Sequence, residues 1–378
     1  MSLVVLTNIP TPYRTAFFDA LAEEAARAGK RFHVLYCAKT EPGRHWPYDA
    51  SKMKHAHTVL RGFHPSLTGI QAHLNPGVLA ELNMLKPDTL LLAGSWNTPT
   101  MLIAGLNIYS PAPRRFFWSE GHADAALHKS GLIAWFRRRV YRTFDGFAVP
   151  NPKSAEWAIA QAGGSRPIVD LPNAIDTKFF SRPSATTRQE VRRQLGFAGA
   201  ARVLLQVGLL HSAKGAPELA EAFLKMRPSI TDNTVLAFAG SGPAESLLHD
   251  LATKSQGSIR LLGQLSPEGI RKALWAADVF ILNTRRDANP LSAIEASATG
   301  LPIVMSAAAG NISELVEGPN TGFVIRDPDD PTEALRAVLA ASDEQLAAMG
   351  ARAAANAQRF DAPAVARSLI KQLYPSSS

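Results

Sequence analysis

Two acidic residues, Asp287 and Glu295, lie eight positions apart, just after the apolar run DVFIL. The first follows the end of a predicted strand, and the second falls more than one turn into a predicted helix. Carboxylates in such positions can accept hydrogen bonds from vicinal hydroxyl groups, which a sugar or a ribose supplies in pairs. The alternative interpretation is a capping acid followed by a solvent-facing helix glutamate.

The predicted helix between these acids begins near an Asn-Pro step. Pro290 suits the first turn of a helix, because its missing N–H is not needed there. Asn289 or Asp287 is then the expected N-cap. The next amides, of Leu291 and Ser292, together with the helix dipole would form a site for an anion, with the Ser292 hydroxyl as a further donor.

A lysine and three glycines follow two earlier apolar runs. The stretch QVGLLHSAKG predicts a strand, a turn containing Gly208, and then Lys214 just before a helix. A lysine in this place can reach phosphates as a point charge. The stretch FAGSGP repeats the scheme, with Gly240 and Gly242 permitting a tight turn before Pro243. Such turns need glycine in any case, so the motifs gain weight from their order and spacing.

The first half of the chain also has polar residues after its predicted strands. Pro12 and Arg14 follow LVVLTN, Trp96 follows TLLLAG, and Glu120 and His122 follow RRFFWS. A His-Glu pair at a strand end suits deprotonation of an acceptor hydroxyl or stabilisation of an oxocarbenium ion. The alternatives are a turn with a solvated histidine, and a tryptophan that packs in the core.

Short apolar runs alternate with amphipathic stretches along the whole chain, which is typical of parallel sheets with crossover helices. Predicted strands cover residues 3–8, 32–37, 89–94, 114–119, 144–150, 202–208, 234–240, 259–263, 278–283, 301–306 and 322–327. The mixed stretch 171–200 is the best domain junction, which suits a chain of 378 residues. We therefore predict an α/β protein made of two doubly wound, Rossmann-like domains that face a central cleft.

Composition narrows the functional class. Hydrophobic residues make up 46% of the chain and charged residues 19%, as expected of a globular protein, and the formal net charge is +8. The single cysteine, Cys37, excludes an intrachain disulfide. The first residues lack a basic leader region, and no apolar run reaches the roughly 20 residues that span a bilayer, so we expect a cytoplasmic protein.

One basic stretch, WFRRRVYR at 135–142, predicts a different kind of contact. Its arginines, at 137, 138, 139 and 142, fall largely on one side of a helix, with Trp135 and Phe136 beside them. This pattern is found in helices that lie on an acidic membrane face, although a solvated helix face is an equal alternative. Peripheral attachment to the inner membrane face is therefore an open expectation.

Other short motifs have simpler explanations. The acidic run DPDD at 327–330 precedes a predicted helix, so we interpret it as a cap and not as a metal site. The HAH sequence at 55–57 has no third ligand in view. No phosphate loop of the GxxxxGK[ST] type and no RNA-binding aromatic motif occurs, so nucleic acid is not an expected partner.

The second half resembles the family-4 retaining glycosyltransferases of GT-B fold over nearly its full length. The similar segments are VGLLHSAKG, FAGSGP, LGQLSPEGIRKALWAADVFILNT, RRDANPLSAIEASATGLPIV and AAGNISELV. The first half resembles the same family more loosely, through TNIPTPYRTAFFDALAEE, LLAGSWNTPT and FFWSEGHADA, which are similar to members that build bacterial surface polysaccharides. LPNAIDTKFF resembles the family's entry to the second domain, and RFDAPAVARSLIKQLY its terminal helix.

The resemblance implies a role for each motif of the second half. Glu295 would hold the ribose of a nucleotide sugar, and Asp287 would hold hydroxyls of the transferred sugar. The amides of Leu291 and Ser292 would approach the sugar and the distal phosphate, and Lys214 would neutralise the diphosphate. The donor would also contact the glycine turns and Asn289.

The resemblance further implies an organisation and a reaction. We expect an acceptor-side domain at 1–175, a donor domain at 176–357 and a terminal helix at 358–378 that crosses back to the first domain. The reaction would move a sugar from a nucleoside diphosphate to a glycan or lipid-linked acceptor with retention of configuration, in surface or exopolysaccharide synthesis. Arg14 and Pro12 would meet acceptor or diphosphate. No cofactor and no metal is expected, because Lys214 and helix amides can meet the leaving charge.

Three positions depart from the family pattern. The first acid is Asp287 where glutamate is usual, Asn289-Pro290 replaces Phe-Gly, and Leu209 stands where an arginine is usual. His211 and Arg286 are the nearest candidates to replace that arginine. Two alternatives therefore stay open: a non-catalytic protein that binds nucleotide sugars, and a nucleotide-sugar epimerase of the same architecture.

Overall fold

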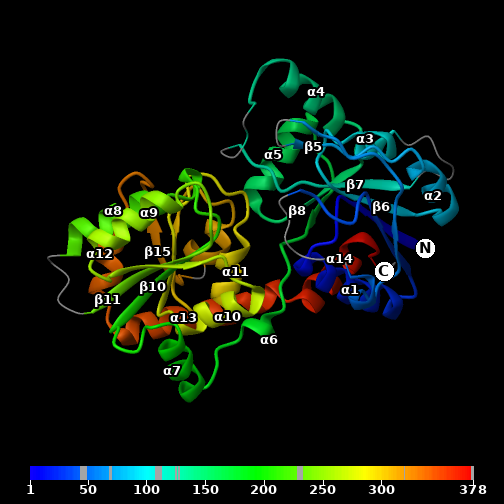
Figure 1. Cartoon of the computed structure of the whole chain (residues 1–378). Coiled ribbons are helices and arrows are strands. Elements are labelled where there is room, and N and C mark those ends of the chain that lie inside the picture. The colour runs from blue at the N-terminus through cyan, green and yellow to red at the C-terminus, as the bar shows by residue number, and fades with distance from the viewer. Residues whose placement is uncertain are drawn as a thin grey trace. The chain divides into compact units, whose positions relative to one another are not determined.

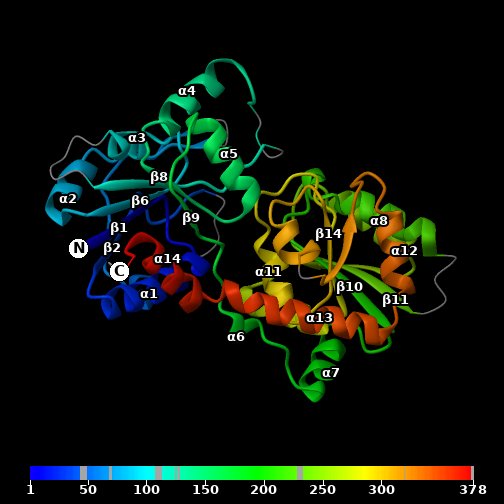
Figure 2. The same ribbon diagram turned by 180° about the vertical axis from the view of Figure 1, so that it is seen from behind.

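The computed structural model of the protein describes residues 1–42, 49–67, 70–106, 113–123, 126, 128–227, 233–318 and 320–375. The chain divides into two compact units: Met1–Asp176 with the segment from Phe360 onward, and Thr177–Arg359. Figure 1 shows both units with many of their elements labelled, and Figure 2 shows the opposite side.

The first unit is built on a parallel sheet. Its strands are β1 (Ser2–Thr7), β2 (Arg31–Tyr36), β3 (His57–Val59), β6 (Thr89–Ala93), β7 (Arg114–Trp118), β8 (Gly146–Val149) and β9 (Ile168–Asp170). Within the described residues their order is β3-β2-β1-β6-β7-β8-β9, so the strand order reverses between β1 and β6. Ligands of doubly wound sheets bind at such a reversal, beyond the carboxyl ends of the strands.

Helices cover both faces of this sheet. They are α1 (Pro12–Arg27), α2 (Val78–Leu85), α3 (Pro99–Gly105), α4 (Gly131–Tyr141), α5 (Pro152–Ala162) and α14 (Ala362–Leu373), with a 3-10 turn at Ala50–Lys52 and a hairpin of β4 (Ser66–Leu67) and β5 (Ile70–Gln71). Leu3 and Val5 pack into one core with α1 and α14, whereas Val4 and Leu6 pack into another with α2 to α5. In Figure 1, α1 and α14 lie side by side on their face of the sheet.

The second unit repeats this plan with a shorter sheet. Its strands are β10 (Arg202–Val207), β11 (Thr234–Ala239), β12 (Ile259–Gly263), β13 (Val279–Leu282), β14 (Ile303–Ser306) and β15 (Gly322–Ile325). Their order, β12-β11-β10-β13-β14-β15, is that of a dinucleotide-binding domain, and all neighbours are parallel. The order reverses between β10 and β13, and the expected ligand site therefore lies where these two strands end.

The helices of the second unit again form two layers. One layer holds α8 (Ala216–Met226), α9 (Glu245–Lys254) and α12 (Thr332–Ala340), and the other holds α10 (Pro267–Ala276), α11 (Leu291–Ala298) and α13 (Asp343–Ala357). Figure 2 shows α11 beside α13 on the second face. The remaining helical segments are α6 (Thr177–Phe180), α7 (Ala185–Gln194), the 3-10 turn Ser212–Lys214, the π-helical turn Ser313–Glu317 and the 3-10 turn Gln358–Phe360.

Candidate functional site

The turns after β10 and β11 lie against each other at the point where the strand order reverses. Gly208 N–H donates to the Ala239 carbonyl, and Leu210 N–H donates to the Ser241 carbonyl, at 3.0 and 2.9 Å. A Cβ at Gly240 would stand 2.0 Å from the Gly208 oxygen, and one at Gly242 would stand 2.4 Å from the Leu210 oxygen. Both positions therefore require glycine for backbone contact, and Pro243 follows them on an exposed surface.

Lys214 is held in a short 3-10 turn between β10 and α8, which we call the Lys214 turn (Ser212–Lys214). His211 begins it, with Nδ1 accepting a hydrogen bond of 3.0 Å from the Ala213 amide. Gly215 ends it at φ 60°, and a Cβ at this position would lie 1.9 Å from the Asn283 oxygen. The Lys-Gly pair thus has two purposes: the lysine supplies the charge, and the glycine lets the turn approach β13.

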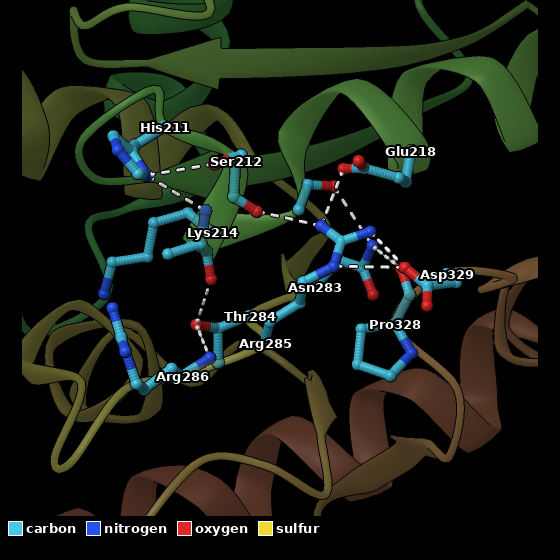
Figure 3. A network of polar contacts seen from close by, with 12 residues as sticks. His211, Ser212, Lys214, Glu218, Asn283, Thr284, Arg285, Arg286, Pro328 and Asp329 are labelled. Atoms are coloured by element: carbon cyan, nitrogen blue, oxygen red, sulfur yellow. Dashed lines mark hydrogen bonds and ion pairs between the residues drawn. The ribbon is translucent and has the colours of Figure 1, made fainter. Parts of the chain in front are cut away.

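The segment after β13 fastens the Lys214 turn (Figure 3). Asn283 Nδ2 donates to the Gly215 carbonyl, at 3.0 Å, and to the Pro328 carbonyl, at 2.8 Å. Thr284 Oγ1 donates to the Ala213 carbonyl at 3.0 Å. The sequence motifs did not point to these two residues. Their position directly after the carboxyl end of a predicted strand is the feature that could have identified them.

Arg285 is the centre of the same network. Its Nη1 donates to the Ser212 carbonyl at 2.8 Å and lies 3.1 Å from Glu218 of α8, and its guanidinium also pairs with Asp329. Hydrogen bonding to Glu218 raises the pKa of Arg285, burial opposes this, and Asp329 raises it further. Asp329 belongs to the DPDD run, which we expected to cap the next helix. That expectation is wrong, because Pro331 is the N-cap of α12 and no side-chain cap is found among the described residues. Asp330 accepts a hydrogen bond of 3.3 Å from the Thr332 amide in the first turn.

Lys214 and Asp287 form an ion pair across the reversal point. Asp287 Oδ1 also accepts a hydrogen bond of 3.2 Å from the Asn289 amide, and the Asp287 carbonyl accepts one of 2.9 Å from Gly310. The cation predicted for phosphate and the carboxylate predicted for sugar hydroxyls are therefore direct neighbours. The sequence predicted both residues but not their contact.

Helix α11 begins one residue later than its sequence suggests. Pro290 is the N-cap, and among the described residues no side-chain cap is found, so the expectation that Asp287 or Asn289 would cap the helix is wrong. The Asp287 carboxylate is bound to the Asn289 amide and to Lys214 instead. Leu291 and Ser292 are half-buried in the first turn, and the Ser292 hydroxyl donates to the Val207 carbonyl at 3.1 Å, which ties α11 to the end of β10.

Glu295 lies in the next turn of α11 and is half-buried. Among the residues that the structure describes, no hydrogen bond or ion pair to its carboxylate is found. Burial raises its pKa to about 7. A buried carboxylate without a partner lowers the free energy of unfolding at neutral pH, where it must lose its proton. Residues with such strongly shifted pKa values are concentrated at functional sites.

Leu209, which stands where the related family has an arginine, is 56% exposed. Of the two candidate replacements, His211 already uses Nδ1 to accept from Ala213. Arg286 is exposed, and Figure 3 shows its side chain on the same side of the network as that of Lys214. Arg286 is therefore the better placed cation.

The first unit has a cavity of 730 Å³ at its own reversal point. The ends of β1 and β6 contribute Thr7 and Gly94 to its lining, and β7 contributes Trp118. Trp96, Glu120 and His122 line it as well, but Pro12 does not: it is exposed at the start of α1.

Arg14 is held by several contacts at this cavity. Its Nη1 donates to Thr7 Oγ1 at 3.0 Å and to the Ala93 carbonyl at 2.9 Å, Nη2 lies 3.3 Å from Glu120, and the guanidinium stacks over Trp118. Burial alone would lower the pKa of Arg14, but Tyr13 and Glu120 raise it above its ordinary value. Arg14 thus connects the ends of β1 and β6 with the segment that follows β7. Its contact with Glu120 holds that carboxylate at the cavity.

His122 follows in the same loop and is 1% exposed. The solvated histidine considered as an alternative is therefore excluded. Trp96 packs against Phe136 of α4, with ring centroids 6.0 Å apart.

The described residues contain no group of three or more histidine, cysteine, aspartate or glutamate side chains that could hold a metal ion. His55, from the HAH sequence, instead contacts Asp19 at 2.6 Å and Tyr36 at 3.0 Å inside the first unit. No helix in the described part of the chain is long and apolar enough to cross a membrane.

Comparison with known proteins agrees with this architecture. Residues 187–360 match the family model of glycosyl transferases group 1. The chain is 30% identical over 206 residues to a GDP-mannose-dependent monoacylated alpha-(1-6)-phosphatidylinositol monomannoside mannosyltransferase of Corynebacterium glutamicum, which is 52% of this chain and 53% of that protein. It is 34% identical over 140 residues to a putative teichuronic acid biosynthesis glycosyltransferase of Bacillus subtilis, 37% and 33% of the two chains. The matched region spans about half or less of these relatives.

Solved structures extend the similarity to the whole chain. Anabaena HepE in complex with UDP superposes with a TM-score of 0.74 at 18% identity, over 99% of both chains. WaaG, a glycosyltransferase involved in lipopolysaccharide biosynthesis, superposes with a TM-score of 0.68 at 16% identity, over 100% of both chains. Residues 187–360 are therefore similar to the group 1 family of glycosyl transferases, and the whole chain has the GT-B fold.

Proposed function

We propose that this protein is a retaining glycosyltransferase that moves a sugar from a nucleoside diphosphate to a glycan or lipid-linked acceptor, in the synthesis of a surface polysaccharide. The observation that carries the proposal is the Lys214–Asp287 pair where β10 and β13 end, together with Glu295 in the following helix, for which no partner is found among the described residues. A diphosphate against the first turn of α11 would compete with Asp287 for Lys214 and leave the carboxylate for sugar hydroxyls. Ribose hydroxyls would donate to Glu295.

In the proposed reaction the bond between the anomeric carbon and the diphosphate oxygen breaks, and its electron pair leaves with the diphosphate. Lys214 meets the charge that develops there. The acceptor oxygen attacks on the same face, and its proton passes to a donor phosphate oxygen. We favour same-face attack over a two-step displacement because no motif of the sequence marks a carboxylate as a covalent nucleophile. NMR analysis of the product anomer tests retention, and loss of activity in EDTA would contradict metal independence.

Binding and turnover with UDP, GDP and ADP sugars test the assignment, with a cell extract as the source of acceptor. Lys214→Ala should lower turnover about 100-fold or more, as expected when one group that stabilises developing charge is removed. Glu295→Ala should weaken nucleotide-sugar binding about 10- to 100-fold. Lys225→Ala and Glu221→Ala change exposed residues of α8 and serve as matched controls. Unchanged affinity and turnover in folded Lys214 and Glu295 variants would contradict the proposal.

A non-catalytic protein that binds nucleotide sugars is the second candidate, and the exposed Leu209 favours it. Both candidates predict binding of a nucleotide sugar, but only the enzyme releases nucleotide in an acceptor-dependent manner. An epimerase would release nucleotide and an altered sugar without any acceptor.

Helix α4 supports a proposal that the acceptor is reached at an acidic membrane face. Its outward side exposes Leu132 by 79%, Ile133 by 46%, Trp135 by 56% and Phe136 by 42%. The exposed cations around them are Lys129, Arg138, Arg139 and Arg142. The sequence 126–144 contains no acidic residue, so this surface is suited to anionic headgroups. Ile133 also lines the cavity, so the same helix borders both surfaces.

Sedimentation with phosphatidylglycerol vesicles tests this contact. The wild type should bind these vesicles and dissociate from them at high salt. It should not bind phosphatidylcholine vesicles. The double variant Leu132→Gln/Trp135→Gln should lose binding, whereas Leu247→Gln, on an exposed apolar residue of α9, should keep it. If the double variant instead changed the oligomeric state, the surface would be a protein interface.

A further inference from the structure

Arg137 differs from every other arginine of the basic run on α4. The sequence placed it with Arg138, Arg139 and Arg142 on one outward side, and the structure shows that this is wrong for Arg137. It is 6% exposed, whereas the other three are exposed. It shares the inward face of the helix with Ala134, Val140 and Tyr141, and it lines the cavity of the first unit.

The neighbours that hold Arg137 carry no negative charge. Nε donates to Gln161 Oε1 at 3.1 Å, Nη2 donates to the His128 carbonyl at 2.8 Å, and the guanidinium stacks over the Trp157 ring at 4.8 Å from its centroid. Among the described residues, Nη1 has no hydrogen bond. The side chain is therefore fixed in orientation while one of its nitrogens is left to donate.

The two glutamates of the cavity lining contact cationic or histidine side chains other than Arg137. Glu120 pairs with Arg14 at 3.3 Å, and Glu41 contacts His73 at 2.9 Å. No carboxylate of the described residues lies within ion-pair distance of Arg137. Burial lowers the pKa of Arg137, and Tyr141 opposes this, while Arg138 lowers it further. An inward-facing cation without a counter-ion costs folding free energy.

Other polar atoms of the lining also have no partner. Arg14 Nε and Trp118 Nε1 are buried without a hydrogen bond among the described residues. Buried donors are normally paired, and a group of unpaired ones around one cavity suggests that a ligand completes it. Thr11 Oγ1 and Asn8 Oδ1 of the lining are likewise buried without a hydrogen bond among the described residues; the hydroxyl can donate, whereas the amide oxygen can only accept. Three of these four atoms can therefore donate to an oxyanion.

We propose that Arg137 binds an oxyanion of the acceptor, a phosphate or a carboxylate, in the cavity of the first unit. The guanidinium fork is the side chain best suited to such groups, and Trp157 and Gln161 hold it ready. That the anion belongs to the acceptor rests on the function proposed above, whereas the presence of an anion site does not.

Isothermal titration with inorganic phosphate, methyl phosphate and D-glucuronate tests the site in the full-length protein. UDP binding is measured first, and the anions are then titrated with UDP at saturation, so that the second unit is occupied. Arg137→Gln and Arg137→Met should weaken binding of the anion about 10- to 100-fold, and Arg137→Lys should weaken it less. Arg138→Gln changes the exposed neighbour on the same helix and should bind as the wild type does.

Circular dichroism and thermal unfolding establish that each variant is folded, and Arg137→Met keeps the apolar stem if Arg137→Gln is unstable. Binding of phosphate alone, of glucuronate alone or of both supports the site and identifies the anion. Equal binding by wild type and folded Arg137 variants overturns the proposal, as does no binding to the wild type. Displacement of all phosphate by UDP overturns the assignment to the acceptor. A failure of UDP, GDP and ADP all to bind counts against the proposed glycosyltransferase and leaves the anion titration, then done without nucleotide, as the test of Arg137.

Discussion

At the scale of single residues, Glu295 links stability to pH. Its pKa is about 7 in the folded protein, against an ordinary value of 4.5. Between these pH values the folded chain keeps a proton that the unfolded chain has lost. The free energy of unfolding should therefore fall as the pH rises from 4.5 to 7, by up to about 3 kcal/mol.

Glu295→Gln removes this titration. The variant should be more stable than the wild type at pH 8 and similar to it at pH 4.5, which urea unfolding at both pH values can measure. Glu221→Gln, on an exposed acid of α8, is the control. A Glu295 variant with the same stability difference at both pH values would contradict the raised pKa.

Leu209 permits a prediction of gained function. The residue is 56% exposed beside the Lys214 turn, so a longer side chain fits without moving the core. Leu209→Arg should add a cation for the diphosphate and strengthen nucleotide-sugar binding about 10-fold, as one charge-assisted hydrogen bond does. Arg286→Ala should weaken binding in the wild type, but less in the Leu209→Arg background. An unchanged Kd in Leu209→Arg would show that the position does not face the phosphates.

At the scale of elements, the Lys214 turn depends on one glycine. Gly215 has φ 60°, and a Cβ there would lie 1.9 Å from a backbone oxygen of Asn283. Gly215→Ala should therefore destabilise the protein by about 2 kcal/mol or more, and turnover should fall with it. Gly77→Ala, at the start of α2, has open space around its Cβ and should be close to neutral in thermal unfolding.

Arg285 tests how the same turn is positioned. It contacts the Ser212 carbonyl, Glu218 and Asp329, but we assign it no contact with substrate. Arg285→Ala should lower kcat about 10-fold or more with a smaller change in KM, because Lys214 loses its orientation. Arg285→Lys should restore part of the loss. Equal activity of wild type and Arg285→Ala would show that Asn283 and Thr284 hold the turn without it.

At the scale of the whole molecule, the end of the chain completes the first unit. The residues of α14 pack in one core with α1 and the sheet, and Arg114 Nη2 donates to the Leu373 carbonyl at 2.5 Å. Removing residues 361–378 would expose that apolar face. The truncated chain should lose the first unit's protection in limited proteolysis while residues 177–359 stay resistant. Full resistance of both units would contradict the assignment of α14.

Much of the fold of the whole molecule could be predicted from the sequence. The α/β class and the family resemblance are confirmed, because alternating apolar runs and the glycine turns are local in sequence. The strands of the second unit were all expected, whereas β3, β4, β5 and β9 of the first unit were missed, since each is only two or three residues long. The roles predicted for Asp287, Glu295, Lys214, Glu120 and His122 stay predictions.

The sequence by itself determined the types of the chemical groups and the strand ends from which they come, since periodicity and turn chemistry are written in neighbouring residues. Only the tertiary structure decided which groups touch. It joined Lys214 to Asp287, left Glu295 without a partner in the described part of the chain and turned Arg137 inward, away from its exposed neighbours on α4. The physical reason is that burial and ion pairing depend on strands and helices brought together from distant parts of the chain, and no local pattern records that approach.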